Sequence, residues 1–279
     1  MKPFYLLLFL ALILSFNAFA ADTIVKNEGF DSLLNVPYGN DSAQRMDIYL
    51  PAGRSAAKTG ALILLHGGAW GSGSRHSFSA YIDSFKTRLP GYAIFNVDYK
   101  LVSQEVHFTD QEADIKAAVD FIAAHASDYS IDTGKFVLMG VSAGAHLAML
   151  QAYKNSSPQI AAVIDFFGPA DLDAMYNNPW NPMIPHIMEL AIGGTPQTSS
   201  LYHDLSPVNF IHAGTPPTLI LHGKRDYVVD ISQSQLLQQR LEQAGVTHKL
   251  VVYPNAGHGW AGSTLSDSFD AIIAFLYER

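Results

Sequence analysis

The chain has 279 residues, of which 25 are acidic, 17 are basic and none is cysteine, so its formal net charge is −8. A hydrophobic content of 48% excludes a disordered chain, and the deficit of Lys and Arg argues against a nucleic-acid-binding surface. The absence of cysteine excludes disulfides, a thiolate nucleophile and zinc sites built from thiolates.

The first twenty residues have the pattern of a secretory signal peptide. Lys2 supplies a positive charge, residues 4–14 form an unbroken apolar run, and Ala18-Phe19-Ala20 is typical of a cleavage site. The run is short for a membrane-spanning helix, which takes about 17–25 apolar residues. We therefore expect a signal peptide at 1–20, export to the periplasm or beyond the cell, and no stable membrane insertion of the mature chain.

The rest of the chain, residues 21–279, alternates strand patterns with helical patterns. In chain order, we expect a half-buried strand at 45–50 and further strands at 61–65, 92–97, 136–139, 161–167, 218–221 and 249–253. Between them we expect a helix with apolar positions 78, 81, 82 and 85, a helix opened by a capping box at 109–112 and a helix from 145. A further helix is expected between a second capping box at 230–233 and Gly245, and a final helix around 269–276. Continuous apolar runs are typical of parallel strands covered on both faces. The alternation predicts a single doubly wound α/β domain, with a mostly parallel sheet and helices on both faces.

Residues 169–195 interrupt this alternation directly after an expected strand. An insertion at the carboxyl end of a strand is expected to lie over the ligand crevice, as a small lid. Its apolar side chains, together with Trp70, are candidate pocket residues, although core packing explains aromatic and methionine residues equally well. The candidates are Trp70, Tyr176, Trp180, Met183 and Met188. The alternative is a packed surface excursion with no ligand.

A G-x-S-x-G motif, Gly140-Val141-Ser142-Ala143-Gly144, joins an expected strand to an expected helix. A serine on such a turn adopts a tight backbone conformation, and its hydroxyl projects at the top of the sheet. The N-terminus of the following helix favours the negative charge that develops during attack. The motif predicts that Ser142 is a catalytic nucleophile.

A serine nucleophile needs a base and an acid that orients the base. His258 is the strongest candidate base, because it lies between two glycines in a loop after the last expected strand. Asp226 follows the preceding strand, and the order Ser142, Asp226, His258 is that of α/β-hydrolases. Asp230 is the rival acid, but we expect it to cap a helix together with Gln233.

Backbone N–H groups would stabilise the oxyanion. Ala143 follows the nucleophile directly, and Gly67 and Gly68 follow the strand at 61–65, where glycine permits close approach of the backbone. This chemistry requires neither a metal nor an organic cofactor.

These motifs together resemble the α/β-hydrolase fold carboxylesterases of the hormone-sensitive-lipase and feruloyl/acetyl-esterase-like (BD-FAE-like) type. The resemblance rests on His66-Gly67-Gly68, Asp98-Tyr99-Lys100-Leu101, Gly140 to Gly144, His222-Gly223-x-x-Asp226 and Gly257-His258-Gly259. It implies the α/β-hydrolase fold, the triad Ser142, Asp226 and His258, and the oxyanion donors Gly67, Gly68 and Ala143. Val141 and the sequence HGGAW depart from the hormone-sensitive-lipase pattern, which favours the small, nearly capless secreted esterases.

The predicted function is that of a serine hydrolase that cleaves short-chain or aryl and acetyl esters through an acyl-enzyme on Ser142. Its expected partner is a small-molecule ester. The alternatives are an amidase or peptidase of the same fold, of the aryl formamidase or exopeptidase type, and a catalytically silent binding protein. The sequence leaves the acyl group, the alcohol group and the oligomeric state open.

Overall fold

The computed structural model describes residues 24–27, 29–155, 160–179 and 181–278. The predicted signal peptide lies outside the described residues. Within them, no helix combines the length and the apolar character that crossing a bilayer would require.

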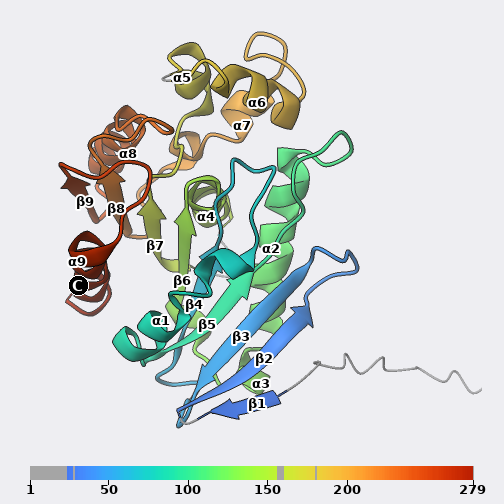
Figure 1. The fold of residues 1–279 in the computed structure, drawn as a ribbon, viewed down its shortest axis with the longest axis vertical. Coiled ribbons are helices and arrows are strands. Elements are labelled where there is room, and N and C mark those ends of the chain that lie inside the picture. Colours follow the sequence, from blue (N-terminus) through green and yellow to red (C-terminus); the bar gives the residue numbers. More distant parts are fainter. Residues whose placement is uncertain (1–23, 28, 156–159, 180, 279) are drawn as a thin grey trace, which may run out of the picture.

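The described residues form one sheet of nine strands in the order β1-β2-β3-β5-β4-β6-β7-β8-β9 (Figure 1). The pairs β1/β2, β2/β3 and β3/β5 are antiparallel, whereas every pair from β5 through β4 to β9 is parallel. The strands are β1 (Ile24–Asn27), β2 (Phe30–Pro37), β3 (Arg45–Pro51), β4 (Gly60–Leu65), β5 (Tyr92–Val97), β6 (Phe136–Val141), β7 (Ile160–Phe166), β8 (Thr218–Gly223) and β9 (His248–Tyr253).

Helices connect the parallel strands. The α-helices are α1 (Ile82–Arg88), α2 (Phe108–Ala124), α3 (Ala126–Tyr129), α4 (Ala143–Lys154), α5 (Leu172–Asn177), α6 (Ile184–Ile192), α7 (Leu201–Asp204), α8 (Ser232–Gln243) and α9 (Gly262–Tyr277). Three short 3₁₀ helices are η1 (Arg75–Phe78), η2 (Thr133–Lys135) and η3 (Pro207–Phe210). The seven expected strands are all present, so the predicted doubly wound sheet is confirmed.

Two strands at one edge of the sheet, β1 and β2, were not predicted. Strand β2 mixes polar and apolar residues, its pairing with β3 shifts register between Leu33 and Val36, and Asn35 has a positive φ of 58°. This bulge breaks the two-residue alternation that would have indicated a strand.

Both expected capping boxes were wrong in detail. Helix α2 begins at Phe108, and the Asp110 carboxylate accepts from the His107 N–H at 2.9 Å, so Thr109 is not the cap. At α8, the side-chain oxygen of Gln233 accepts from the backbone N–H groups of Ala170 and Asp171, at 2.9 and 2.8 Å. That long-range contact takes the side chain away from the local box with Asp230.

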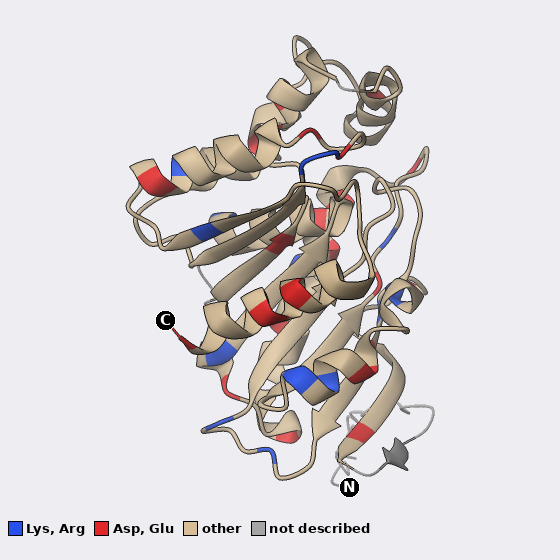
Figure 2. Cartoon of the chain, turned by 60° about the vertical axis from the view of Figure 1, so that its left-hand side comes forward, with Lys and Arg blue, Asp and Glu red and all other residues tan. Residues whose placement is uncertain are grey.

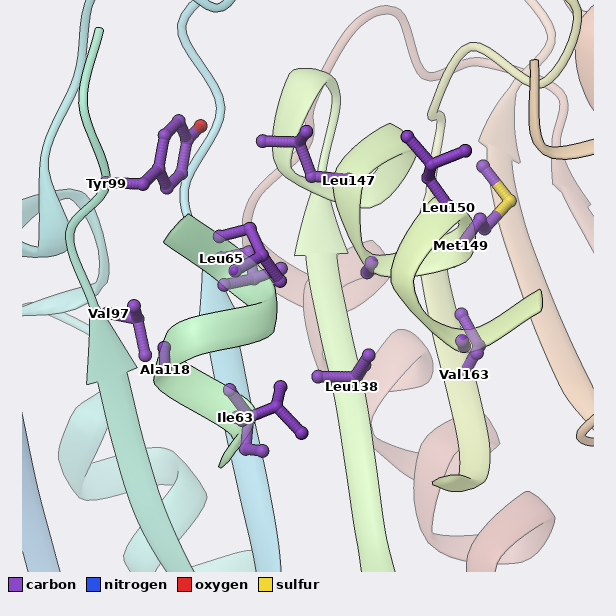
Figure 3. Packing of buried hydrophobic residues seen from close by; sticks show 14 of the residues in the cluster. Ile63, Leu65, Val97, Tyr99, Ala118, Leu138, Leu147, Met149, Leu150 and Val163 are labelled. Carbon is purple, nitrogen blue, oxygen red and sulfur yellow. The ribbon is translucent and has the colours of Figure 1, made fainter. Parts of the chain in front are cut away.

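The core lies on both faces of the sheet. Along β4, Ile63 and Leu65 face a layer that includes α2, α4 and α8, whereas Leu62 and Leu64 face α1 and α9. Figure 3 shows the first layer, with Ile63, Leu138 and Val163 from neighbouring strands beneath Leu147 of α4. Burial on both faces explains why the central strands are continuously apolar.

The sheet has a switch point between β4 and β6. The chain leaves β4 toward β5 on one side and leaves β6 toward β7 on the other. The loops after these two neighbouring strands therefore diverge, which opens a crevice at their carboxyl ends. Helices α5, α6 and α7 form a group beyond the same ends of β6 and β7 (Figure 1).

Charged residues are spread over the surface elements. Figure 2 shows Lys and Arg positions interspersed with Asp and Glu positions along the helices and loops. An ion pair joins α1 to α9, with 2.6 Å between the guanidinium of Arg88 and the carboxylate of Asp270.

Candidate active site

Ser142 lies in the sharp turn between β6 and α4. Its backbone has φ 55° and ψ −119°, a conformation that costs a non-glycine residue about 1–3 kcal/mol. A Cβ atom on Gly140 would lie 2.2 Å from the carbonyl oxygen of Gly144, and one on Gly144 would lie 2.1 Å from the carbonyl oxygen of Leu65. The turn therefore packs without room for a side chain at either position, as the G-x-S-x-G motif predicts.

His258 lies between Ser142 and Asp226. Its Nε2 is 2.9 Å from the Ser142 Oγ, and its Nδ1 is 2.7 Å from the Asp226 Oδ2. Since a carboxylate only accepts, Nδ1 carries the proton and Nε2 is left to accept the serine proton. The ring of Phe167 packs 4.5 Å from the imidazole, centre to centre, and restricts its orientation.

The Asp226 side chain is fully buried and held by four donors. Its Oδ1 accepts from the N–H groups of Val228 and Val229, at 2.8 and 3.0 Å, while Oδ2 faces His258 and His222. Burial alone would raise the pKa of this carboxyl. Hydrogen bonds from His222, His258 and Val228 outweigh burial and hold the pKa of Asp226 well below its usual range. The acid therefore stays ionised, as the base requires.

The rival acid Asp230 has a local partner instead, as does Asp171, a further carboxylate that follows a strand. Asp230 accepts from the Ser232 N–H at 2.8 Å, and Asp171 caps α5 through the Ala174 N–H at 2.9 Å. Asp226 is the carboxylate bonded to His258, as predicted.

The loop after β4 lies against the nucleophile. A Cβ atom on Gly67 would be 3.3 Å from the Cβ of Ser142, so the two residues are in direct contact. Among the described residues, no hydrogen bond is donated by the N–H groups of Gly67, Gly68 or Ala143. These groups are therefore available as hydrogen-bond donors, and the oxyanion roles of the three residues stay a prediction.

Buried polar contacts hold this loop in place. The ring of Tyr99 stacks on His66 at 4.3 Å, and its hydroxyl donates to the His66 carbonyl at 2.6 Å. The amide of Gln111 donates to the carbonyls of Trp70 and Lys100, at 2.7 Å each. The Asp98-Tyr99-Lys100-Leu101 motif thus packs against the loop after β4 and stabilises its position.

Trp70 is a structural residue. It is 3% exposed, and its indole N–H donates to the Nδ1 of His146 at 3.2 Å. Burial lowers the pKa of His146 to about 4, so this imidazole is neutral and Nδ1 accepts, while Nε2 donates to the Leu205 carbonyl. Packing and a buried hydrogen bond explain the tryptophan.

The other candidate pocket residues lie elsewhere. Met188 is buried in the core, Met183 is 57% exposed, and the Tyr176 hydroxyl donates to Glu189 at 2.5 Å. Trp180 lies outside the described residues. The insertion that carries them borders a separate cavity of about 360 Å³, which it shares with Val228 and α8.

The apolar cavity beside the triad comes from different elements. It measures about 180 Å³ and is lined in part by Gly67, a candidate oxyanion donor, and by Val141 and Gly259, which are next to Ser142 and His258 in the chain. Its walls are largely aromatic and come from η1, α1, α9 and the residues directly before α1, after β7 and before α9: Phe78, Tyr81, Phe85, Phe167, Trp260 and Phe269. The apolar stripe at 78–85 is expected from its spacing to pack as part of a helix, and that spacing does not reveal that the stripe also lines a cavity.

Comparison with known proteins identifies the family of this chain. Residues 46–241 match the model of the BD-FAE family. The chain belongs to the BD-FAE family. Its fold is the α/β-hydrolase fold, as predicted from the motifs.

Named esterases are among the relatives of this BD-FAE chain. Esterase LipC of Mycobacterium tuberculosis is 26% identical over 260 residues, which cover 86% of this chain and 64% of LipC. The chain spans about half to two thirds of the length of LipC, LipM and LipQ, three of the curated relatives that it matches.

Two solved structures cover nearly the whole fold. A truncated carbohydrate esterase from gut microbiota has a TM-score of 0.77 and 25% identity, over 93% of this chain and 98% of the other. Esterase 2 of Thermogutta terrifontis, phosphonylated by sarin, has a TM-score of 0.73 and 28% identity, over 86% and 92%.

Proposed function

We propose that this BD-FAE protein is a serine carboxylesterase that forms an acyl-enzyme on Ser142. The proposal rests chiefly on one observation, the relay in which His258 bonds the Ser142 Oγ at 2.9 Å and Asp226 at 2.7 Å. The elbow conformation and the free N–H groups beside it support the same chemistry. The esterase names of its relatives agree with it.

The reaction has two halves. His258 takes the proton of Ser142 as Oγ attacks the ester carbonyl, and the N–H groups of Gly67, Gly68 and Ala143 stabilise the oxyanion. The intermediate collapses, the C–O bond breaks, and His258 returns the proton to the leaving alcohol. Water then attacks the acyl-enzyme with His258 again as base, which releases the acid and restores the serine.

We further propose that the substrates are short-chain or aryl esters, including acetyl esters. The aromatic cavity beside Ser142 accommodates a small acyl or aryl group at about 180 Å³. Glycan esters are the natural class to screen, because one structural neighbour is a carbohydrate esterase and one relative is an endo-1,4-β-xylanase of Butyrivibrio fibrisolvens.

Export remains part of the proposal. The pattern of residues 1–20 supports cleavage by signal peptidase and delivery to the periplasm or beyond the cell. The N-terminal sequence of the protein recovered from the envelope fraction tests this directly. A recovered chain that begins at Ala21 supports cleavage, and one that begins at Met1 contradicts it.

The decisive experiment measures hydrolysis of p-nitrophenyl esters from acetate to palmitate by the wild type and by Ser142→Ala. We expect rapid cleavage of acetate and butyrate, and a loss of at least about 10⁴-fold in the variant. Parallel assays with p-nitroanilides and labelling with a fluorophosphonate separate the alternatives. Cleavage of anilides but not of esters would indicate an amidase or peptidase. If the protein hydrolyses neither substrate and Ser142 is not labelled by the fluorophosphonate, a binding protein is indicated.

A further inference from the structure

A second histidine contacts the catalytic acid. His222 lies at the carboxyl end of β8, its side chain is fully buried, and its Nε2 is 3.3 Å from the Asp226 Oδ2. This is the same carboxylate oxygen that bonds the Nδ1 of His258 at 2.7 Å. The sequence pattern predicts no part in catalysis for His222.

The neighbours of His222 fix where its proton lies. Nε2 is 3.0 Å from the carbonyl oxygen of Val229, and a carbonyl only accepts, so Nε2 carries the hydrogen. Nδ1 is 2.6 Å from the Ser234 Oγ and accepts the hydroxyl proton of that serine. Nε2 thus carries the one N–H of the His222 ring; it is hydrogen-bonded to the Val229 carbonyl at 3.0 Å and lies 3.3 Å from the Asp226 Oδ2.

The contact between His222 and Asp226 comes from outside the loop that carries Asp226. The two N–H groups that bond Oδ1 belong to Val228 and Val229, in the same loop as Asp226 itself, and would move with that loop. His222 belongs to a central strand, and Ser234 belongs to the first turn of α8. The series of side-chain contacts from Ser234 through His222 to Asp226 thus connects the loop that carries Asp226 to strand β8 and to helix α8.

We propose that His222, oriented by Ser234, is a positioning residue that holds Oδ2 of Asp226 toward His258 and keeps the negative charge on that oxygen. A donor on Oδ2 lowers the basicity of the carboxylate, so the proton that His258 takes from Ser142 stays on the imidazole. A fixed carboxylate also keeps the imidazole in the tautomer whose Nε2 is free to accept.

The test compares four variants. His222→Leu removes the Nε2–H donor and keeps most of the side-chain volume. His222→Gln keeps an N–H donor at about the same distance from the backbone as Nε2. Ser234→Ala removes the hydroxyl that orients the ring. His248→Leu is the matched control, because His248 lies at the start of the adjacent strand and bonds only the Val246 carbonyl among the described residues, at 2.8 Å.

For esterase turnover we expect His222→Leu to lower kcat by about 10- to 100-fold, the rate equivalent of one hydrogen bond to a charged group, with KM within about twofold. His222→Gln recovers most of this loss, Ser234→Ala loses several-fold, and His248→Leu keeps wild-type kcat. The proton NMR resonance of the His258 Nδ1–H shifts in His222→Leu and returns toward its wild-type position in His222→Gln.

This inference rests on the proposed function, and the two are distinguishable. If the wild type hydrolyses no ester, the proposed function fails, while the Nδ1–H resonance still reports whether His222 acts on the Asp226–His258 pair. Wild-type kcat and an unshifted resonance in folded His222→Leu would overturn the inference. A Gln variant as impaired and as thermally unstable as the Leu variant would also overturn it, because packing alone would then explain the histidine.

Discussion

Gly67 and Ser142 lie so close that no side chain fits between them. A Cβ atom on Gly67 would be 2.9 Å from the carbonyl oxygen of Val141 and 3.3 Å from the Cβ of Ser142. The loop after β4 and the turn after β6 therefore meet at Ser142, as the proposed role of Gly67 as an oxyanion donor requires.

Gly67→Ala is expected to lower kcat by about 10²–10³-fold, the typical cost of losing one oxyanion donor, because the new methyl group must push the loop away. Gly71→Ala is the matched control. It lies in the same loop, and its Cβ would meet only ordinary contacts at 3.8 and 3.9 Å. Steady-state kinetics on p-nitrophenyl acetate measures both variants, and an unchanged kcat in folded Gly67→Ala would rule out this donor.

Asp226→Asn is expected to reduce kcat by about 10⁴-fold while the protein stays folded, because an amide no longer selects the productive tautomer of His258. Asp230→Asn keeps the oxygen that accepts from the Ser232 N–H and should stay within a few-fold of wild type. Equal losses in the two variants would contradict the assignment of the acid.

Narrowing the aromatic cavity should change acyl-chain preference. Leu265 of α9 lines this cavity, so Leu265→Trp is expected to reduce kcat/KM for butyrate relative to acetate by about tenfold or more. Met183→Trp is the control, since Met183 is 57% exposed and belongs to the insertion. Paired kinetics with the two esters measure the ratio, and a larger change in Met183→Trp would place the acyl group under the insertion instead.

Asp165 should make stability depend on pH. Burial raises its pKa to about 7, opposed by the N–H of Gly168 and by His222, and its Oδ2 has no hydrogen-bond partner among the described residues. Between about pH 4 and 7 the folded state keeps a proton that the unfolded state releases. The stabilisation is therefore fully present below pH 4 and is lost as pH rises through 7.

Asp165→Asn removes this titration, so its Tm relative to wild type should be higher at pH 8 than at pH 5, by a few degrees. Asp83→Asn, at a carboxyl that is 93% exposed, is the control. Scanning calorimetry at the two pH values measures both variants. A constant difference in Tm between Asp165→Asn and wild type would show that the buried carboxyl does not titrate in this range.

Local sequence was enough to predict the central sheet and to name three side chains that the fold brings within hydrogen-bond distance, Ser142, His258 and Asp226. Strands β4 to β8 are largely apolar and buried because helices cover both faces of the sheet, so their apolar runs could be recognised in the sequence. The G-x-S-x-G turn has a backbone requirement that only its own glycines satisfy. Asp226 and His258 each follow a strand, so chain order placed them at one edge of the sheet.

Tertiary structure decided what depends on contacts between distant segments. Trp70 bonds a histidine 76 residues away, Gln233 bonds the backbone at 170 and 171, and the aromatic cavity combines η1 with α9. Side-chain type alone does not distinguish a core aromatic residue from a pocket residue, because both are apolar. Only the packing of the folded chain leaves space beside one and fills it beside the other.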